Sequence, residues 1–191
     1  MSVVTLAKGF FNQQAMNAIK KTEIVLDIGC GIMPQSCIKP SVHICVEPFA
    51  EYIKALQQKV LVKPDRHYII IQATWHQAVE VFPPKSVDSI FLLDVIEHLD
   101  KEEGRKLLKA TEKIARQQIV IFTPLGFLPQ HHPDGRDIWG YNGGAWQEHR
   151  SGWTPDDLGD SYDIFVCESY HQRDNQTYGA IWAVKNINPA G

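Results

Sequence analysis

The chain has 191 residues, of which 44% are hydrophobic and 21% charged, a composition typical of one globular domain with a sizeable core. Because 19 Lys and Arg stand against 22 Asp and Glu, the formal net charge is -3, which gives no electrostatic basis for nucleic acid as a partner. No apolar run reaches the ~18 residues of a membrane span, and the N-terminal residues lack a secretory pattern, so we expect no membrane partner.

Apolar runs and helical patterns alternate along the first two thirds of the chain. Helical spacing of apolar residues predicts helices at residues 6–20, 50–59, 75–81 and 101–116. Apolar runs predict strands at residues 24–28, 42–46, 67–71, 88–93 and 118–122. The middle runs are continuously apolar, which favours parallel strands covered by helices on both faces.

Two helix starts carry capping signals. Asp100, with Glu103 three residues later, predicts a capping box at the start of the helix over 101–116. Thr154 followed by Pro155 predicts a short helix with Thr as its cap and Pro in its first position.

The composition of the chain and the periodicity of its apolar residues change after residue 123. Residues 124–154 are rich in Pro, Gly and aromatic residues and show no periodicity, as is typical of a functional loop. Two strands follow, over 162–169 and 178–185, and the polar run between them predicts an antiparallel pair. The expected fold is a three-layer α/β sandwich with a Rossmann-like, mostly parallel sheet and an antiparallel last strand. We expect one domain over 1–191, with an N-terminal helix in 1–21 and a cap loop in 124–154.

The four cysteines are Cys30, Cys37, Cys45 and Cys167. None forms a C-x-x-C pair, so the usual zinc-binding spacing is missing. Cys45 lies in an apolar run and is expected in the core. A reduced, cytoplasmic compartment is the simplest interpretation.

The segment from Val25 to Gly31 (Val-Leu-Asp-Ile-Gly-Cys-Gly) places two glycines directly after the first predicted strand of the repeat. In an open parallel sheet, ligands bind beyond the carboxyl ends of the strands. Glu47 ends the next strand, where a carboxylate can accept two hydrogen bonds from a ribose diol. The pattern therefore predicts a nucleoside-containing cofactor.

The continuation of the loop distinguishes two cofactor classes. A dinucleotide needs a third glycine and a helix N-terminus for its pyrophosphate, but Pro34 occupies the third-glycine position. Residues 29–41 are a short crossover with two prolines, which leaves room for little helix. Asp27 would repel a pyrophosphate and suits the cationic part of S-adenosylmethionine, which therefore fits this loop better.

The glycine segment resembles the first motif of the class I S-adenosylmethionine-dependent methyltransferases. The resemblance extends to Val46-Glu47-Pro48, to the segment 86–90 (Ser-Val-Asp-Ser-Ile), and to the segment 93–99 (Leu-Asp-Val-Ile-Glu-His-Leu). Together these motifs span roughly residues 22–123 in the order and spacing of the family. Met33 stands where the family usually has a further glycine, and Gln72 to Trp75 replace its frequent acid after the third strand.

The resemblance implies a set of cofactor-binding residues. The residues of the first motif would line the methionine part of the cofactor, and Glu47 would hold the ribose hydroxyls. The segment 73–75 would contact the adenine, and Asp94 would lie beside the cofactor where substrate enters. The full set is Asp27, Gly29, Cys30, Gly31, Glu47, Pro48, Ala73, Thr74, Trp75, Asp94 and Val95.

The loop over 124–154 is the candidate substrate-binding segment, because its aromatic residues can wall a pocket. The candidate substrate residues are His131, Trp139, Tyr141, Trp146 and Trp153. His149 is a candidate general base, and His98 a second candidate for which packing is the stronger alternative. His131, His132 and Asp134 could suggest a metal, but no second ligand cluster stands at a defined spacing, so no metal site is predicted.

The expected function is an S-adenosylmethionine-dependent methyltransferase with a small-molecule acceptor. One alternative is a module that binds S-adenosylmethionine without catalysis. A less favoured alternative is an NAD-dependent oxidoreductase, against which Pro34 argues. The residues identify neither the acceptor nor the oligomeric state.

Overall fold

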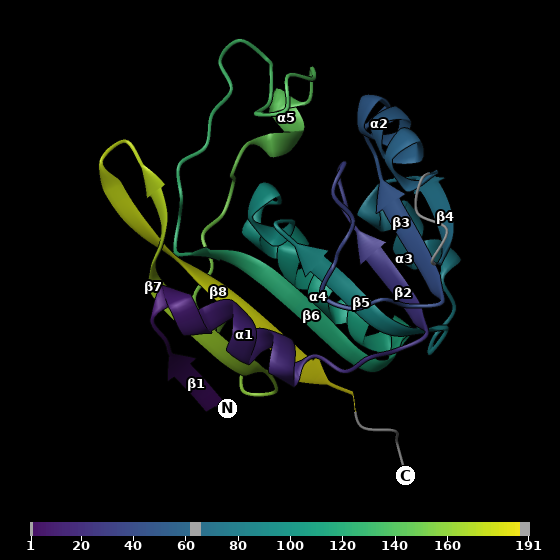
Figure 1. Cartoon of the computed structure of the whole chain (residues 1–191), viewed down its shortest axis with the longest axis horizontal. Helices are drawn as coiled ribbons and strands as arrows, with labels where there is room; N and C mark the ends of the chain where they lie inside the picture. Colours follow the sequence, from purple (N-terminus) through teal and green to yellow (C-terminus); the bar gives the residue numbers. More distant parts are fainter. Residues whose placement is uncertain (1, 62–65, 188–191) are drawn as a thin grey trace.

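The computed structural model describes residues 2–61 and 66–187, which form one eight-stranded sheet flanked by helices (Figure 1). The strand order is β1-β7-β8-β6-β5-β2-β3-β4. Only β8 runs antiparallel to its neighbours β6 and β7, so the predicted fold class is confirmed. The strands are β1 (Ser2–Thr5), β2 (Ile24–Ile28), β3 (Val42–Glu47), β4 (His67–Gln72), β5 (Val87–Leu93), β6 (Ala115–Leu125), β7 (Asp163–Arg173) and β8 (Gln176–Asn186).

All predicted helices are present, with ends shifted by a few residues. They are α1 (Lys8–Ala18), α2 (Ala50–Val60), α3 (Trp75–Val81), α4 (Lys101–Ile114) and α6 (Pro155–Leu158). The sequence patterns missed three short elements: β1, which pairs with β7, the 3-10 helix η1 (Ile96–His98) and α5 (Gly144–Gln147). Within the described residues, none of the helices combines the length and apolar character needed to cross a membrane.

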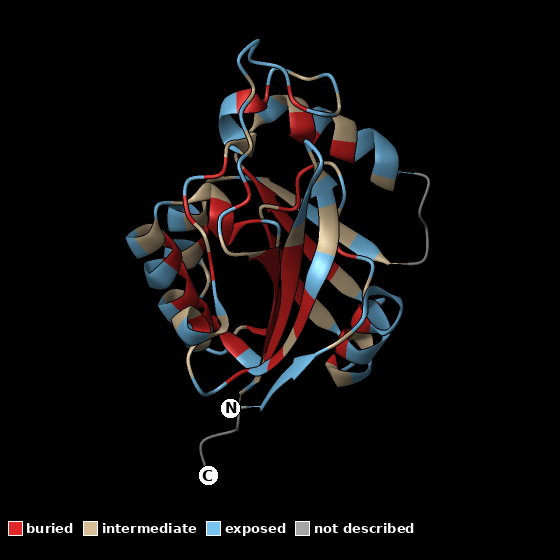
Figure 2. Ribbon diagram, turned by 90° about the vertical axis from the view of Figure 1, so that its left-hand side faces the viewer, coloured by how far each residue is buried: buried red, intermediate tan, exposed pale blue. Residues whose placement is uncertain are grey.

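The helices form layers on both faces of the sheet. One face of β2, β5 and β6 packs against α3 and α4 through a large cluster that includes Leu26, Ile90 and Leu107. The opposite face packs against α1 through a second cluster that includes Phe11 and Phe91. Cys45 lies under α2, beside Leu56, in the core position expected for it. Buried residues accordingly follow the strands between the helices (Figure 2).

The crossover from β2 to β3, residues 29–41, contains no helix, as its prolines predict. The buried side chain of Ile38 covers part of the sheet instead, in one cluster with Val25 and Phe91. Two hydrogen bonds between Gln35 and Ile38 fix this loop: the Gln35 amide donates to the Ile38 carbonyl, and the Ile38 N–H donates to Gln35 Oε1. An extended loop therefore replaces the helix that most parallel crossovers carry.

One predicted cap is confirmed and the other is wrong. The Asp157 carboxylate accepts hydrogen bonds of 2.9 Å from both the N–H and the hydroxyl of Thr154, so α6 has its capping box. Asp100 precedes α4, but its side chain makes no capping bond. The Glu103 carboxylate pairs instead with Lys106 and His76, which a local cap signal cannot reveal because His76 lies on α3.

Gly104 lets α4 lie against the indole of Trp153. A Cβ atom at Gly104 would overlap Cζ2 of Trp153, whose side chain is 0% exposed. Lys101, one turn earlier on α4, holds its Nζ 4.2 Å from the centroid of the same ring. The glycine costs helix propensity, so close packing is the physical reason for its position.

We expect Gly104→Ala to lower the free energy of unfolding by up to ~2 kcal/mol, because overpacking of ~1–3 kcal/mol outweighs a propensity gain of ~1 kcal/mol. Urea denaturation measures the change. Gly9→Ala in α1 is the matched control, since no atom lies within 4 Å of its added Cβ, and it should be neutral or stabilising. Equal stabilisation by both substitutions would contradict the packing of Trp153 on α4.

Candidate functional site

The carboxyl ends of β2 and β5 meet at the centre of the sheet, where the chain order changes direction. From β2 the chain runs outward to β3 and β4, and it returns to β5 on the other side of β2. Crevices at such switch points are the usual ligand sites of open α/β sheets. The candidate site therefore lies where the loops after β2 and β5 face each other.

The glycine loop approaches the end of β5 too closely for any side chain. Gly29 and Gly31 have φ of 69° and 54°, the left-handed region that favours glycine. A Cβ at Gly29 would lie 2.9 Å from Cγ2 of Val95. Both conformation and space thus require glycine at position 29.

Glu47 shapes the same loop from the end of β3. Its Oε2 accepts a 3.0 Å hydrogen bond from the Gly31 N–H, and its Oε1 accepts a 2.9 Å bond from the Phe49 N–H. The residue is only 4% exposed, and this burial raises the pKa of its carboxyl to about 7. Each oxygen has an unused lone pair, so the carboxylate can still accept hydroxyl groups.

A first cavity lies at this switch point, between the ends of β2, β3 and β5. Most of the predicted cofactor residues come together in its lining: Gly29, Glu47, Pro48, Ala73, Thr74, Trp75, Asp94 and Val95. Trp146, a predicted substrate residue, and His98 also line it. Ile28 and Leu99, from the two motif segments, complete the wall together with Tyr52 and Gln147, which did not stand out in the sequence.

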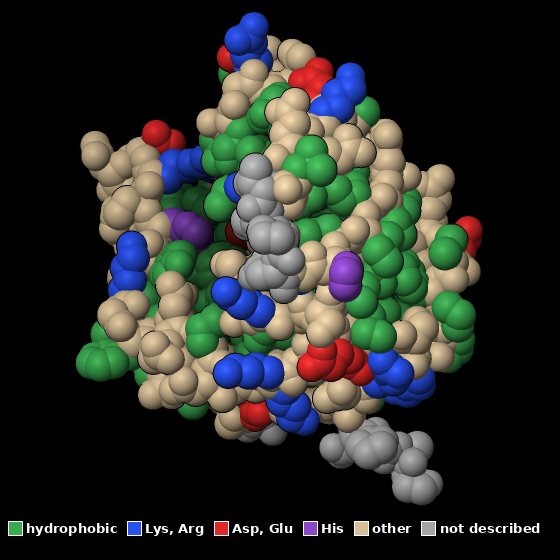
Figure 3. Space-filling view, turned by 45° about the vertical axis from the view of Figure 1, so that its right-hand side comes forward, with side chains coloured by type: hydrophobic (Ala, Val, Ile, Leu, Met, Phe, Trp, Pro, Cys, Tyr) green, Lys and Arg blue, Asp and Glu red, His purple; other side chains and the backbone are tan. Residues whose placement is uncertain are grey.

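A second cavity adjoins the first and shares Gly29, Asp94, His98 and Gln147 with it. Its lining includes four more predicted residues: Cys30, Gly31, Trp139 and His149. It also includes Met33, which is 62% exposed and leaves the glycine loop open. His171 and Arg173, from the end of β7, add polar groups that the sequence patterns did not indicate. On this side of the molecule Figure 3 shows a hollow with apolar walls, a histidine inside it and Lys or Arg side chains at its edge.

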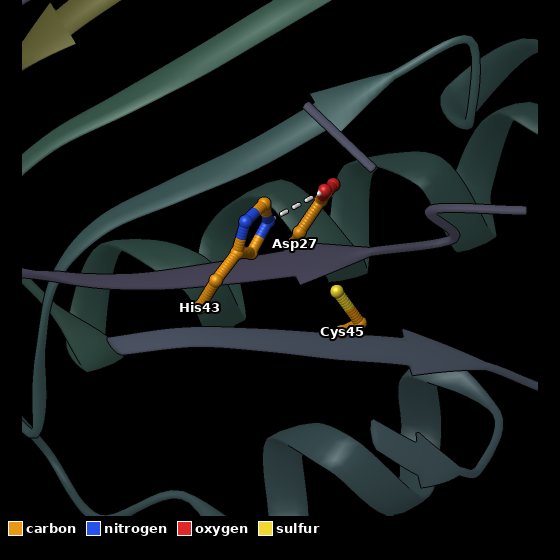
Figure 4. A group of neighbouring side chains, drawn as sticks. All are labelled: Asp27, His43 and Cys45. Atoms are coloured by element: carbon orange, nitrogen blue, oxygen red, sulfur yellow. Dashed lines mark hydrogen bonds and ion pairs between the residues drawn. The ribbon is translucent and has the colours of Figure 1, made fainter. Parts of the chain in front are cut away.

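Asp27 lies in the core and lines neither cavity, so the expected contact between its carboxylate and a cofactor stays a prediction. Its Oδ2 accepts a 2.7 Å hydrogen bond from the Gln35 N–H and lies 3.0 Å from His43 Nε2. Figure 4 shows this pair with Cys45 beside it. Burial alone would lower the pKa of His43, but bonds to Asp27 and Cys45 outweigh it and raise the pKa to about 9. Asp27 and His43 thus form a buried ion pair that holds the loop.

The turn after β5 brings two carboxyls together. Asp94 has φ of 52°, a left-handed conformation uncommon outside glycine, and its side chain faces both cavities. Glu97 lies in η1, is 1% exposed, and its Oε2 accepts a 3.0 Å bond from the Thr123 hydroxyl. Burial raises the pKa of Glu97 well above its ordinary value, and nearby Asp94 adds repulsion. Asp94 is exposed to solvent, but desolvation by the surrounding protein raises its pKa to about 6.

Backbone hydrogen bonds tie the segment before α6 to η1. The N–H groups of Arg150 and Ser151 donate to the Glu97 carbonyl at 2.7 and 3.1 Å. The His98 ring places Nδ1 3.0 Å from the Glu148 carbonyl. The rings of His98 and His149, which are distant in sequence, therefore lie with their centroids 4.8 Å apart.

Both histidines are uncharged at neutral pH. Burial lowers the pKa of His98, and burial together with the neighbouring His98 lowers the pKa of His149 to about 4. The predicted general base His149 is therefore free to accept a proton or donate a lone pair, but it is only feebly basic.

The cap loop is anchored on α2, as its position near that helix in Figure 1 suggests. The Tyr52 hydroxyl donates a 2.5 Å hydrogen bond to Asp137 Oδ2, while Asp137 Oδ1 accepts from the N–H groups of Trp139 and Tyr141. Glu51 accepts two further bonds from Asn142. Nothing in the local sequence marks Tyr52 or Asp137, because their importance arises from a contact between distant segments.

Three of the predicted substrate residues do not line the two cavities. His131 is exposed, and Tyr141 lies in a separate surface groove over α2. Trp153 is a core residue, because it packs on Gly104 and its Nε1 donates a 2.9 Å bond to the Ser151 hydroxyl. Of the five, only Trp139 and Trp146 reach the cavities.

Comparison of sequences finds no matching family model and no matching curated protein. Comparison of structures finds a methyltransferase dependent on S-adenosylmethionine (SAM) from Archaeoglobus fulgidus, 16% identical, with a TM-score of 0.57 over 91% of this chain and 90% of that one. A SAM-dependent methyltransferase from Methanosarcina mazei is 13% identical, with a TM-score of 0.59 over 89% and 94% of the two chains.

A magnesium protoporphyrin IX methyltransferase from Synechocystis, crystallised with bound SAM, is 12% identical and has a TM-score of 0.55 over 93% of this chain and 79% of that one. At these identities the similarity concerns the fold. The chain has the fold of the class I S-adenosylmethionine-dependent methyltransferases.

Proposed function

We propose that this protein is a SAM-dependent methyltransferase that acts on a small-molecule acceptor. The observation that carries the proposal is the convergence of Gly29, Glu47 and Asp94 on one cavity at the switch point of the sheet. That cavity opens into a second one beneath the cap loop. Two joined cavities suit a cofactor and an acceptor that must meet.

The lining of the first cavity suggests how SAM would be held. Glu47 would accept hydrogen bonds from the two ribose hydroxyls, and Thr74 with Trp75 would flank the adenine. The methionine part would lie along Gly29 and Gly31, near Asp94. Asp27 would act indirectly, by holding the loop through Gln35 and His43.

Methyl transfer from SAM requires alignment of the acceptor with the methyl group more than it requires a strong base. The methyl group of SAM is already activated by its sulfonium, so a bond from the acceptor to the methyl carbon forms as the carbon–sulfur bond breaks. Correct placement of the two reactants can supply ~7–11 kcal/mol of the barrier reduction. A base is required only for an acceptor that must lose a proton.

The extended crossover argues against NAD. Residues 29–41, all of which the structure describes, form no helix, so no helix N-terminus follows the glycine loop to receive a pyrophosphate. A module that binds SAM without catalysis would use the same first cavity. Turnover of an acceptor separates that alternative from an enzyme.

Calorimetric titration with SAM, S-adenosylhomocysteine and NAD tests the proposal directly. We expect saturable binding of the first two and none of NAD. Screening hydroxyl, amine and thiol acceptors for S-adenosylhomocysteine release then tests transfer. Binding of NAD alone would contradict the proposal, and SAM binding without any turnover would favour the non-catalytic module.

We expect Gly29→Val to abolish SAM binding, with a loss of more than about 100-fold (~2.8 kcal/mol), because the side chain meets Val95 in a left-handed position. Calorimetry measures the affinity, and circular dichroism checks that the protein is folded. Gly159→Val is the control: Gly159 has φ of 79° but no atom within 4 Å of its Cβ. Retained binding in a folded Gly29→Val protein would mean that this loop is only a turn.

The pKa of Glu47 predicts a pH dependence of SAM affinity. Because burial raises this pKa to about 7, above its ordinary value, the carboxyl is largely protonated at pH 6 and must lose its proton to accept both ribose hydroxyls. SAM should therefore bind about tenfold more weakly at pH 6 than at pH 8.

Glu47→Gln isolates this effect from titration of Asp94 and of SAM itself. At pH 8 the variant should bind SAM more weakly by ~1.5–3 kcal/mol, since a charged acceptor is lost, and the difference should shrink toward pH 6, where the Glu47 carboxyl is itself largely protonated. Its remaining pH dependence should be smaller than that of the unmodified protein. An identical pH profile in the two proteins would remove Glu47 from the ribose site.

A further inference from the structure

Two groups of three potential metal ligands occur among the described residues: Asp27 with His43 and Cys45, and Glu97 with His98 and His149. The first is a closed network, because Asp27 and His43 neutralise each other and neither lines either of the two cavities described above. The second differs, since His98 borders both cavities and His149 borders the second. Only the second group can meet a ligand that enters from the site.

The two imidazoles of this second group are oriented alike. Nδ1 of His98 lies 3.0 Å from the Glu148 carbonyl, and Nδ1 of His149 lies 2.6 Å from the Leu128 carbonyl. A carbonyl oxygen only accepts, so each Nδ1 carries the proton and each Nε2 keeps its lone pair. Metal-binding histidines are held in this way, with one nitrogen donating to a carbonyl and the other facing the ion.

Glu97 supplies an oxygen without a donor. Its Oε2 is bonded to Thr123, but its Oε1 is buried and has no hydrogen-bond partner. The neighbouring carboxyl of Asp94 can share a proton with Glu97 through a hydrogen bond, but it repels Glu97 when both are ionised. A buried carboxylate in this position is costly unless a proton or a cation compensates it.

The geometry points to a divalent transition-metal site formed by Glu97, His98 and His149. One potential ligand atom from each of the three residues lies within 4.8 Å of the other two, and the set of two imidazoles and one carboxylate suits Zn²⁺, Fe²⁺, Mn²⁺ or Co²⁺ better than Ca²⁺ or Mg²⁺, which prefer oxygen. Sequence spacing predicted no metal, because His149 joins the other two ligands only through the contact of the segment before α6 with η1.

The site also indicates the class of acceptor, an inference that rests on the proposed function. Its open side faces the second cavity, so the ion would bind the hydroxyl oxygen of a small alcohol or phenol and lower the pKa of that hydroxyl. The proton leaves to solvent, and the oxygen then forms a bond to the methyl carbon. The carbon–sulfur bond breaks with its electron pair on sulfur, which gives the methyl ether, S-adenosylhomocysteine and one proton.

Two titrations of the unmodified protein, made without SAM, test the site. Co²⁺ should bind with one equivalent per chain and give visible d–d absorption. In protein labelled with ¹⁵N-histidine, Zn²⁺ should shift the Nε2 resonances of His98 and His149 while their Nδ1 atoms remain protonated. Absence of binding, or shifts confined to other histidines such as His43, would overturn the proposal.

Three variants locate the ion by a second route. Glu97→Gln and His149→Ala should each weaken Co²⁺ binding at least about tenfold, whereas His67→Ala, an exposed histidine at the far end of β4, should leave it unchanged. Unchanged affinity in folded Glu97→Gln protein would contradict the site. Should both site variants fail to fold, the ¹⁵N titration of the unmodified protein decides alone.

SAM binding measured with a chelator present separates this inference from the proposed function. Glu47 and Gly29 are not ligands of the ion, so SAM should still bind. If the protein binds SAM but fails to bind Co²⁺ in the titration without chelator, only the metal site is overturned. Metal binding without SAM binding would overturn the methyltransferase proposal and leave the metal site standing.

Discussion

The close approach of Gly29 to Val95 is the constraint on which the site depends. At the carboxyl end of β2 the backbone comes so near the end of β5 that a single added carbon would lie 2.9 Å from a Val95 methyl group. This contact sets the loop after β2 directly opposite the turn after β5. Glu47, at the end of β3, then binds the same loop through the Gly31 N–H and closes the third side of the cavity.

The loop must hold that position without a helix behind it. In its place, the buried pair of Asp27 and His43 fixes the start of the crossover, and the Asp27 carboxylate reaches across the loop to the Gln35 N–H. The side chain of Ile38 then packs against the face of the sheet, in one cluster with Val25 and Phe91. The Asp27 carboxylate of the glycine motif therefore holds the loop in place from within the core.

The sheet and the meeting of the candidate cofactor residues at one cavity were predictable because their signals are local. Continuous apolar runs identify parallel strands, and residues at the carboxyl ends of neighbouring parallel strands, such as Gly29, Glu47 and Asp94, must meet at one edge. The acceptor side was not predictable to the same degree. In the sequence Trp153 is one of several aromatic residues of the loop, and only the structure shows that α4 covers it. The hydrogen bond between Tyr52 and Asp137 joins two distant segments that no common sequence pattern links. Such residues gain their roles from tertiary contacts alone.

The two histidines beside the cavities show why burial can serve transfer chemistry without creating a strong base. Burial disfavours the charged imidazolium, so the pKa of His149 falls to about 4 and its affinity for protons falls with it. The same burial leaves the Nε2 lone pair available at every physiological pH, and the carbonyls at Nδ1 fix its direction. A group tuned in this way is poor at abstracting a proton and well suited to holding an electrophile. Since methyl transfer from a sulfonium depends mainly on alignment, the low basicity of His98 and His149 agrees with the proposed site, which would position an acceptor and lower the pKa of its hydroxyl.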